Sequence, residues 1–368
     1  APRAAMTLAA SVTLGALAPT VVTAQTAGCA PSMFFVNYLN TPDAMAVSWV
    51  TNCSSDATVQ YGPSPALGLS APANQTQYTF MDGLYVSPYL HHAALAGLPP
   101  ATLMYYRVGG AVSGWSPIMN FTSHPGVGAG IPLRLAVLGD LGQPNNSVDG
   151  LAHIQAAALY PFAAVLHAGD LSYADSVEPL WDSWQLMVQS VASRVPYMTV
   201  VGNHEIELDI NLATFEAYRA RFFMPAVYYN TTSQYTDLYY SFNLGPIHFL
   251  MLSSYSDYSN TSAQYTWLLS DLATIDRTVT PWIITVLHAP WYNSNTAHQG
   301  EGEAMREAME ALLYAAGVDM VFAGHVHAYE RCVRTYNWNP DPAGPYFITI
   351  GDGGNREGLA LDWECTWW

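Results

Sequence analysis

The stretch AVLHAGDLSYAD, residues 164–175, joins an apolar run to a glycine, a carboxylate and a tyrosine. The run predicts a buried β-strand that ends just before Asp170. Four more motifs close apolar runs in the same way: Gly-Asp-Leu-Gly at 139–142, Gly-Asn-His-Glu at 202–205, Val-Leu-His at 286–288 and Gly-His-Val-His at 324–327. In an α/β sheet, ligands gather beyond the carboxyl ends of the strands, so the five motifs predict one common site.

Apolar strands alternate with longer amphipathic segments from residue 133 to about 354, which predicts an α/β domain. The expected strands are 133–139, 162–168, 196–202, 238–244, 246–253, 281–287, 318–323 and 345–350. The expected helices lie near 147–159, 179–193, 211–222, 262–275 and 302–316.

Metal-ligating side chains are concentrated in the five motifs. They are Asp140, Asp170, Tyr173, Asn203, His288, His325 and His327. A carboxylate can bridge two cations about 3.5–4 Å apart, and Asp170 is the candidate for that place. A single Gly-Asp is more often a turn or a helix cap, but the ordered set predicts a two-metal hydrolase.

The motifs also predict the backbone conformation around two of these ligand positions. Gly139 is expected to let the chain turn sharply before Asp140. Residues two apart in extended backbone point the same way, so His325 and His327 are expected to approach one centre together.

Tyr173 discriminates between kinds of metal. A phenol has a pKa of about 10 and ionises near neutrality only beside a strong Lewis acid, which favours trivalent iron over a lone divalent ion. A tyrosine is more often a packing residue, and the chain has 24 of them. The spacing from Asp170 is what supports the ligand role.

Two further histidines are candidate catalytic residues. His204 adjoins Asn203 and can donate to a phosphate; the alternative is a surface histidine after a turn. His298 lies in the long segment between His288 and the helix expected at 302, with Tyr292 and Glu301, and is a candidate acid or phosphate-binding group. A surface loop histidine is the competing interpretation for it.

The segment from about 31 to 123 differs in pattern from the rest. Short alternating runs such as 33–39, 44–51, 58–61, 103–109 and 117–122 are separated by turn residues, which predicts a small all-β sandwich of fibronectin III-like layout. Residues 124–132 contain glycine and proline and are expected to form a linker.

Composition excludes some partners. The 368 residues are 51% hydrophobic and 11% charged, with a net charge of −17, and all 11 basic residues are arginine. Nucleic acid and anionic lipid are bound through clustered Lys and Arg, so neither is an expected partner.

The N-terminal segment and the cysteines indicate the secretory pathway. Residues 1–28 are expected to be a signal peptide, so no membrane association is expected after its removal. Six Asn-X-Ser/Thr sequons, at Asn52, Asn74, Asn120, Asn145, Asn230 and Asn260, suit a secreted or vacuolar glycoprotein. The four cysteines fall by region as Cys29 with Cys53 and Cys332 with Cys365, although three connectivities remain open.

Beyond single ligands, the motifs resemble those of the purple acid phosphatases, in the larger plant-type form. The resemblance is carried by GDLSYAD (169–175), GNHEIE (202–207), HAPWYNSN (288–295), EGEAMRE (301–307), GHVHAYER (324–331) and GDGGNREG (351–358). It implies an α+β and α/β chain: a fibronectin III-like β-sandwich at 29–123, a linker at 124–132, a metallophosphoesterase αββα sandwich at 133–358 and a tail at 359–368.

The resemblance also implies the chemistry. Asp140, Tyr173 and His327 would hold Fe(III); Asn203, His288 and His325 would hold a divalent Fe, Zn or Mn; Asp170 would bridge them. A metal-held hydroxide would attack the phosphorus of a small phosphate monoester on the acid side of neutrality. His204 would stabilise the phosphoryl oxygens and His298 would bind phosphate or protonate the leaving oxygen. A homodimer is an allowed assembly.

Two departures from the family pattern stand out. Plant-type members often carry two adjacent histidines where this chain has Ala297-His298, so substrate preference is expected to differ. The family also usually continues with a strand and loop after the position of Gly358, where this chain has LALDWECTWW. A truncated product, or an end fastened by Cys332 and Cys365, would account for this.

Other functions remain open at this stage. One is a metallophosphodiesterase or nucleotide pyrophosphatase with two divalent ions, against which Tyr173 argues. A phytate-specific enzyme would need more basic residues than the scattered arginines supply. The other class is a secreted adhesion glycoprotein with an inert hydrolase domain, which need not retain all seven ligands.

Overall fold

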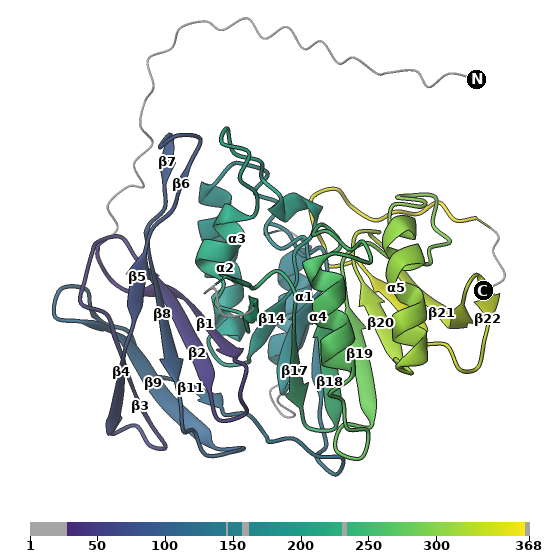
Figure 1. The fold of residues 1–368 in the computed structure, drawn as a ribbon. Helices are drawn as coiled ribbons and strands as arrows, with labels where there is room; N and C mark the ends of the chain where they lie inside the picture. Colours follow the sequence, from purple (N-terminus) through teal and green to yellow (C-terminus); the bar gives the residue numbers. More distant parts are fainter. Residues whose placement is uncertain (1–27, 145, 157–161, 230–233, 365–368) are drawn as a thin grey trace, which may run out of the picture.

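The computed structural model describes residues 28–144, 146–156, 162–229 and 234–364. The expected signal peptide, apart from Gly28, lies outside the described residues, as do Asn145, Asn230 and Cys365. Figure 1 shows a β-sandwich on one side of the molecule and a mixed α/β region beside it.

The N-terminal region is an antiparallel β-sandwich, as the sequence predicts. One sheet has the order β1-β2-β8-β5, and the other has the order β10-β9-β3-β4 with β11 also paired to β9. The strands are β1 Ser32–Tyr38, β2 Met45–Thr51, β3 Thr58–Gly62, β4 Leu69–Pro72, β5 Asn74–Thr76, β8 Tyr89–Leu95, β9 Leu103–Gly110, β10 Gly114–Trp115 and β11 Met119–Thr122. A separate hairpin consists of β6 Thr79–Phe80 and β7 Tyr85–Val86.

A disulfide joins Cys29, just before β1, to Cys53, just after β2. It therefore fixes the start of the described chain to the edge of the sandwich. Cys332 is buried, and its expected partner Cys365 lies outside the described residues. Among the sequons, Asn52, Asn74 and Asn260 are exposed, which leaves them accessible to glycosylation.

Two sheets form the centre of the α/β region. The first is parallel, in the order β12-β13-β14: β12 Leu135–Leu138, β13 Ala164–His167 and β14 Tyr197–Thr199. The second has the order β17-β18-β19-β20-β23-β21-β22. Its strands are β17 Tyr240–Leu244, β18 Ile247–Met251, β19 Trp282–Val286, β20 Met320–Ala323, β21 Tyr329–Tyr336, β22 Asn339–Pro340 and β23 Tyr346–Ile350. Strands β18, β19, β20 and β23 are parallel.

Helices cover the outer faces of both sheets, which gives four layers. The helices are α1 Ser147–Ala156, α2 Pro179–Ala192, α3 Glu216–Arg221, α4 Ala263–Leu272 and α5 Glu303–Ala315. Leu268 of α4 and Met309 of α5 pack with Ile283 and Val321 on the outer face of the larger sheet. The inner face of that sheet belongs to a second core that extends through the smaller sheet into the sandwich. The expected helix–sheet–sheet–helix arrangement is thus present (Figure 1).

Most predicted elements are found within a few residues of their predicted ends. The helix expected at 211–222 is shorter, because Leu212 and Phe215 adopt left-handed backbone with φ of 62° and α3 begins only at Glu216. Strand β21 was not anticipated; it lies between β23 and the terminal strand β22, and most of its residues are exposed or half-buried.

The sandwich and the α/β region share an aromatic interface. Phe35 of β1 lies 6.1 Å from Trp184 of α2, 5.8 Å from Tyr197 of β14 and 5.7 Å from Phe222, measured between ring centroids. All four rings are buried, so the two regions share one core. Among the described helices, none is both long enough and apolar enough to cross a membrane.

Candidate dinuclear metal centre

The five motifs meet where the carboxyl ends of the two sheets converge. Asp140 follows β12, Asp170 follows β13 and Asn203 follows β14, so the smaller sheet contributes three motifs. His288 follows β19, and His325 with His327 follows β20, so the larger sheet contributes the other two. The order of the parallel strands in each sheet therefore brings ligands far apart in sequence to one place.

Backbone strain is concentrated where the five motifs meet. Asp140, Asp170, Tyr173 and His325 have φ of 57°, 53°, 52° and 69°, in the left-handed region that residues other than glycine seldom adopt. Each such residue costs on the order of 1–3 kcal/mol and persists only where its surroundings enforce it. His325 is consequently not in extended backbone, so the extended conformation expected for it is wrong, but His325 and His327 both lie beside the buried carboxylates.

The first group of donors is Asp140, Tyr173 and His327. The Tyr173 hydroxyl lies 3.3 Å from Asp140 Oδ1 and 3.0 Å from His327 Nε2. His327 Nε2 is 3.5 Å from the same carboxylate oxygen. These three side chains therefore present a carboxylate, a phenol and an imidazole to one point.

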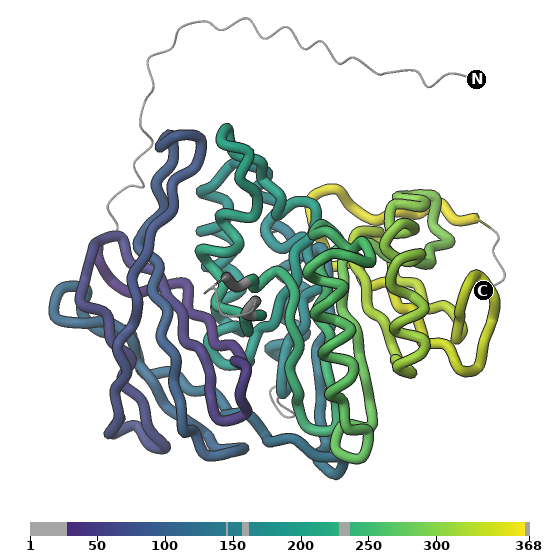
Figure 2. Tube along the Cα trace, in the orientation of Figure 1, coloured from purple at the N-terminus to yellow at the C-terminus, as the bar shows by residue number. Residues whose placement is uncertain are grey.

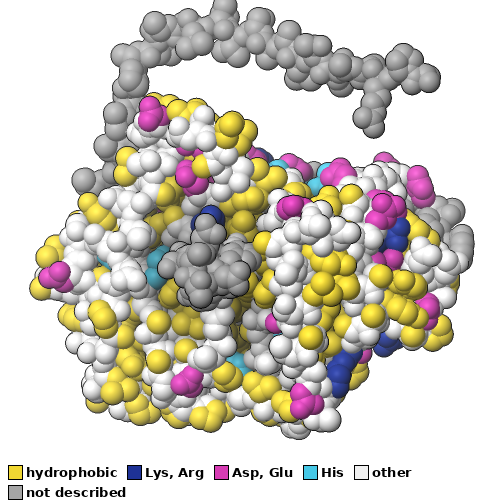
Figure 3. All heavy atoms as spheres, viewed as in Figure 1, with side chains coloured by type: hydrophobic (Ala, Val, Ile, Leu, Met, Phe, Trp, Pro, Cys, Tyr) yellow, Lys and Arg dark blue, Asp and Glu magenta, His cyan; other side chains and the backbone are white. Residues whose placement is uncertain are grey.

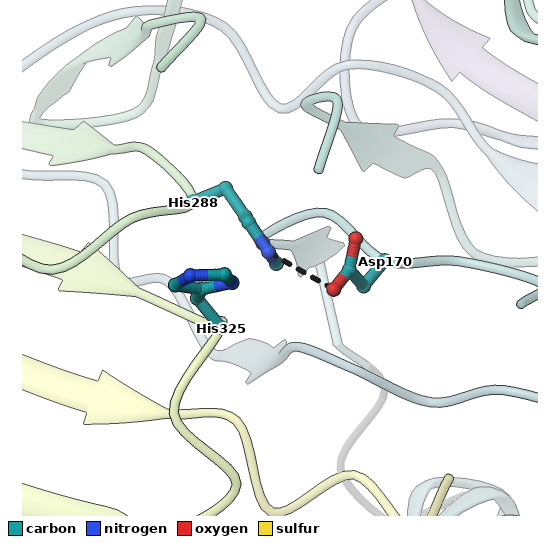
Figure 4. Close-up of side chains that lie close together, drawn as sticks. All are labelled: Asp170, His288 and His325. Carbon is teal, nitrogen blue, oxygen red and sulfur yellow. Dashed lines mark ion pairs between the residues drawn. The ribbon is translucent and has the colours of Figure 1, made fainter. Parts of the chain in front are cut away.

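The second group of donors surrounds His288. Its Nε2 lies 3.0 Å from Asp170 Oδ2 and 3.1 Å from Asn203 Oδ1. Asp170, His288 and His325 each offer a ligand atom within 4.8 Å of the others (Figure 4). Figure 4 shows the two imidazoles and the carboxylate directed toward a common space.

Backbone carbonyls orient two of the imidazoles. His288 Nδ1 donates to Ala168 O at 2.6 Å, and His327 Nδ1 donates to Gly358 O at 3.1 Å. A histidine held this way through Nδ1 directs Nε2 at the centre, which is the usual support of a metal-ligating histidine. The donor set thus fits metal ions.

Buried charge in the centre also fits metal ions. Asp140 and Asp170 are both nearly inaccessible to solvent. Burial raises the pKa of Asp140. Burial alone would also raise the pKa of Asp170, but the adjacent imidazoles of His288 and His204 hold it well below its usual range. Histidines are the positively charged partners that the structure gives these two buried carboxylates, so bound cations would further offset their desolvation.

The buried charges of the centre shift the pKa values of its histidines. Burial alone would lower the pKa of His288, but the carboxylate of Asp170 raises it to about 9. Burial and the neighbouring His288 lower the pKa of His325 to about 4, so His325 is a neutral imidazole suited to metal binding.

Of the two candidate catalytic histidines, His204 lies beside Asp170. Its backbone N–H donates to Asp170 Oδ1 at 2.9 Å, and its ring centroid lies 4.1 Å from that of Tyr173, with the two rings tilted by 35°. Its Nδ1 pairs with Asp175. Burial alone would lower the pKa of His204, but Asp175 and Asp170 raise it to about 9. A protonated imidazole at this position can donate to an anion.

His298 lies on the other side of the centre and is more exposed. Its ring centroid is 3.9 Å from that of His325, and its Nδ1 is 3.0 Å from Glu301 Oε1. The second oxygen of Glu301 lies 2.6 Å from His325 Nε2. His298 is thus connected to the centre through Glu301, at a position that solvent and substrate can reach.

Glu205, within the Gly-Asn-His-Glu motif, supports the centre in a way that sequence reasoning missed. Its buried carboxylate accepts hydrogen bonds from the backbone N–H groups of Gly202, Asp170 and Leu171, at 2.8, 2.8 and 2.9 Å. Burial and the nearby charge of Asp170 raise the pKa of Glu205 to about 7. This carboxylate joins the loop after β13 to the loop after β14.

Other residues around the centre carry no motif of their own. The Tyr255 hydroxyl donates to Asn203 Oδ1 at 3.3 Å. Asn355 Nδ2 donates to Asp140 O at 3.1 Å, and Arg356 Nη1 donates to Tyr173 O at 2.9 Å. The only signal for the last two was their place in GDGGNREG, which the resemblance includes.

Comparison with known proteins covers both regions. Residues 31–123 match the family model described as purple acid phosphatase, N-terminal domain, and residues 133–329 match the model described as calcineurin-like phosphoesterase. Together they span the sandwich and all seven predicted ligands.

Relatives with similar sequences agree with these matches. The chain is 46% identical over 326 residues to purple acid phosphatase 22 of Arabidopsis thaliana, covering 88% of this chain and 72% of that protein. It is 39% identical over 340 residues to a phosphoenolpyruvate phosphatase of Allium cepa, covering 86% and 68%. The solved structure of a purple acid phosphatase from yellow lupin (Lupinus luteus) seeds superposes with a TM-score of 0.83 at 25% identity, covering 92% of this chain and 67% of that one.

Glycines permit the close approach of the motif loops. A Cβ on Gly202 would lie 2.1 Å from Asp170 Oδ1 and 2.5 Å from Asp170 N. A Cβ on Gly324 would lie 2.3 Å from Asp140 Oδ2. Gly139 adjoins Gly324 Cα, and its φ is not positive, so its role is close packing rather than the sharp turn expected for it.

We predict that Gly202→Ala weakens metal binding by about tenfold or more, because the new methyl group displaces Asp170. Metal retained after dialysis against a graded series of chelator concentrations measures the effect. Gly68→Ala is the control, since Gly68 is exposed and a Cβ there meets nothing within 4 Å. Equal retention by Gly202→Ala and the control would contradict the prediction.

Proposed function

We propose the finer chemistry of this chain, which belongs to the purple acid phosphatase family. It is an acid phosphatase with the dimetal site of that family. The proposed reaction is hydrolysis of small phosphate monoesters at a centre of Fe(III) paired with divalent Fe, Zn or Mn. The observation that supports it best is the separation of the donors into two groups around the buried Asp170.

The proposed ligand assignment follows those two groups. Asp140, Tyr173 and His327 form the harder set, with a carboxylate and a phenol, and would hold Fe(III). The divalent ion would be held by Asn203, His288 and His325, with Asp170 between the two ions. When bound, such a pair polarises the phosphoryl oxygens and lowers the pKa of water.

The chain's own residues then bind and orient the substrate. His204, with a pKa raised to about 9, would donate Nε2–H to a phosphoryl oxygen while Asp175 holds Nδ1. His298 would contact the phosphate or the leaving oxygen from the exposed side, with Glu301 orienting its Nδ1. Glu205 would keep Asp170 in register by its three backbone hydrogen bonds.

The scarcity of basic side chains on the surface and around the centre favours a small substrate over nucleic acid. On the face shown in Figure 3, arginines are few and separated from one another. Beside the centre, Asp175, Glu301 and Glu357 are acidic, and Arg356 is paired with Asp175. Such surroundings offer nucleic acid no basic track, so a small monoester is the favoured substrate.

The alternatives are less well supported. A phosphodiesterase or pyrophosphatase with two divalent ions would not need the phenol that Tyr173 places 3.3 Å from Asp140. An inert adhesion protein would not need imidazoles fixed through Nδ1 toward a common point. The Cys29–Cys53 disulfide supports a secreted or vacuolar location. A homodimer is compatible with the reaction, since one chain supplies every named donor.

Catalytic activity should depend on the buried carboxylate of Asp170. Asp170→Asn should lower kcat for p-nitrophenyl phosphate by at least about 100-fold, because it removes a buried negative charge that the cations require. Steady-state kinetics after loading with iron and zinc measure the effect. Asp257→Asn, at an exposed aspartate in the loop after β18, should keep wild-type activity. An Asp170→Asn enzyme as active as this control would remove the proposed centre. Faster turnover of bis-p-nitrophenyl phosphate than of the monoester would favour the diesterase.

The visible spectrum of the bound iron should depend on Tyr173. Iron-loaded protein should show a visible charge-transfer band that Tyr173→Phe abolishes, because only an ionised phenol bound to Fe(III) supplies that transition. Absorption spectroscopy with parallel elemental analysis makes the measurement. Tyr258→Phe, at a half-buried tyrosine elsewhere, should retain the band. A colourless wild-type protein that contains iron would contradict the Tyr173 assignment.

A further inference from the structure

A hairpin of the N-terminal region contacts the segments that follow two of the metal-site motifs. Residues 78–87, which include β6 and β7, are named here the docking hairpin. Figure 2 shows it extending from the sandwich alongside the segments that carry α2 and α3. Two of its tyrosines and one of its backbone N–H groups form hydrogen bonds to the α/β region.

The main contact centres on Arg221, whose side chain is completely buried. Its guanidinium donates to the hydroxyls of Tyr78 and Tyr85, at 3.1 and 3.0 Å. It also contacts Gln185 Oε1 at 2.6 Å and Asp182 Oδ1 at 2.8 Å, both on α2. A buried guanidinium loses its hydration, so each of these partners is needed to offset that loss.

Tyr78 connects this cluster to the start of α2. Its hydroxyl donates to Glu178 Oε2, and Glu178 is buried. The other carboxylate oxygen of Glu178 has no hydrogen-bond partner among the described residues. The hydrogen bond from the Tyr78 hydroxyl therefore holds the Glu178 carboxylate in place.

A second contact reaches the segment after Gly-Asn-His-Glu. Met81 N donates to Asp209 Oδ1 at 2.8 Å. Two residues before Asp209, Glu207 accepts from Ser176 N at 3.1 Å and from Trp181 Nε1 at 2.9 Å. The docking hairpin thus contacts the 173–178 loop directly at Glu178, and it also contacts the segment whose Glu207 bonds to Ser176 of that loop.

That loop is strained and carries groups of the site. Tyr173, Asp175 and Ser176 have φ of 52°, 48° and 68°. Three left-handed residues within four positions do not persist without external restraint. We propose that the docking hairpin is a positioning element: through Tyr78, Arg221 and Glu178 it holds the 173–178 loop so that Tyr173 and Asp175 reach the centre.

Through the docking hairpin, the β-sandwich thus has a role in the site. Tyr106 of the sandwich also bonds across the interface, to Ser193 O at 2.7 Å, but Ser193 is at the opposite end of α2. Tyr78 and Tyr106 thus each donate one buried hydrogen bond to residues flanking α2, one near the loop and one far from it.

The test compares Tyr78→Phe with Tyr106→Phe in the full chain. In the metal-free protein, hydrogen exchange of peptides covering 173–178 should accelerate about tenfold or more in Tyr78→Phe only. In the iron-loaded protein, Tyr78→Phe should shift the visible absorption maximum and lower kcat by about 10- to 100-fold with KM less affected. Tyr106→Phe should lower the unfolding temperature while leaving the spectrum, kcat and loop exchange unchanged.

Equal loop exchange in the two variants would overturn the inference, and so would an unshifted spectrum in Tyr78→Phe. The spectroscopic and kinetic readouts depend on the proposed iron centre, whereas the exchange of the metal-free protein does not. A colourless wild type with selective exchange in Tyr78→Phe would therefore reject the iron and keep the positioning role. If Tyr78→Phe does not fold, Tyr85→Phe replaces it, because this variant also removes one hydrogen bond to Arg221. Tyr85→Phe should accelerate exchange of the 173–178 peptides by a smaller factor, whereas Tyr106→Phe should not. Equal exchange in Tyr85→Phe and Tyr106→Phe would overturn the inference.

Discussion

The structure depends on two carboxylates, Asp140 and Asp170, buried where the carboxyl ends of two sheets meet. Like charges in a poorly solvated space repel each other and lose their hydration, at a cost of several kcal/mol per ion. The neighbouring histidines offset part of this cost, as the raised pKa of His288 shows. The remainder calls for cations, and the inward-facing imidazole nitrogens, amide and phenol are arranged to bind them. The metallophosphoesterase chemistry follows from this requirement.

Much of the surrounding structure serves to hold ligands in backbone conformations that they would not adopt alone. Four of the seven predicted ligands have a left-handed backbone conformation. Gly202 and Gly324 allow adjacent loops to approach within distances that a methyl group would prevent. Glu205 joins the loop after β13 to the loop after β14 through backbone hydrogen bonds, and the docking hairpin restrains the 173–178 part of the first loop from the β-sandwich. Strain at the centre is thus balanced by buried polar contacts around it, which extends the functional unit to the β-sandwich.

The sequence predicted the ends of the strands well, because each apolar run stops one or two residues before a ligand. The seven predicted ligands, as distant in sequence as Asp140 and His327, therefore lie at one place in the structure, and their roles as metal ligands stay a prediction. Sequence reasoning failed where tertiary contacts override local pattern: His325 is left-handed because its N–H donates to both oxygens of Asp140. Glu205, Asp175 and Tyr78 were not identified as supporting residues, since their roles arise from partners distant in sequence and from no periodicity or spacing.

The most direct test of the account is the number of metal ions bound per folded chain. Elemental analysis of purified protein, loaded with iron and zinc and dialysed free of excess metal, should give two ions per chain, at least one of them iron. Thermal unfolding of the same sample should show a higher midpoint than the metal-free protein, because the ions bind only the folded site. A fully folded protein that retains no metal, or that is equally stable with and without it, would contradict the claim that the buried carboxylates require cations.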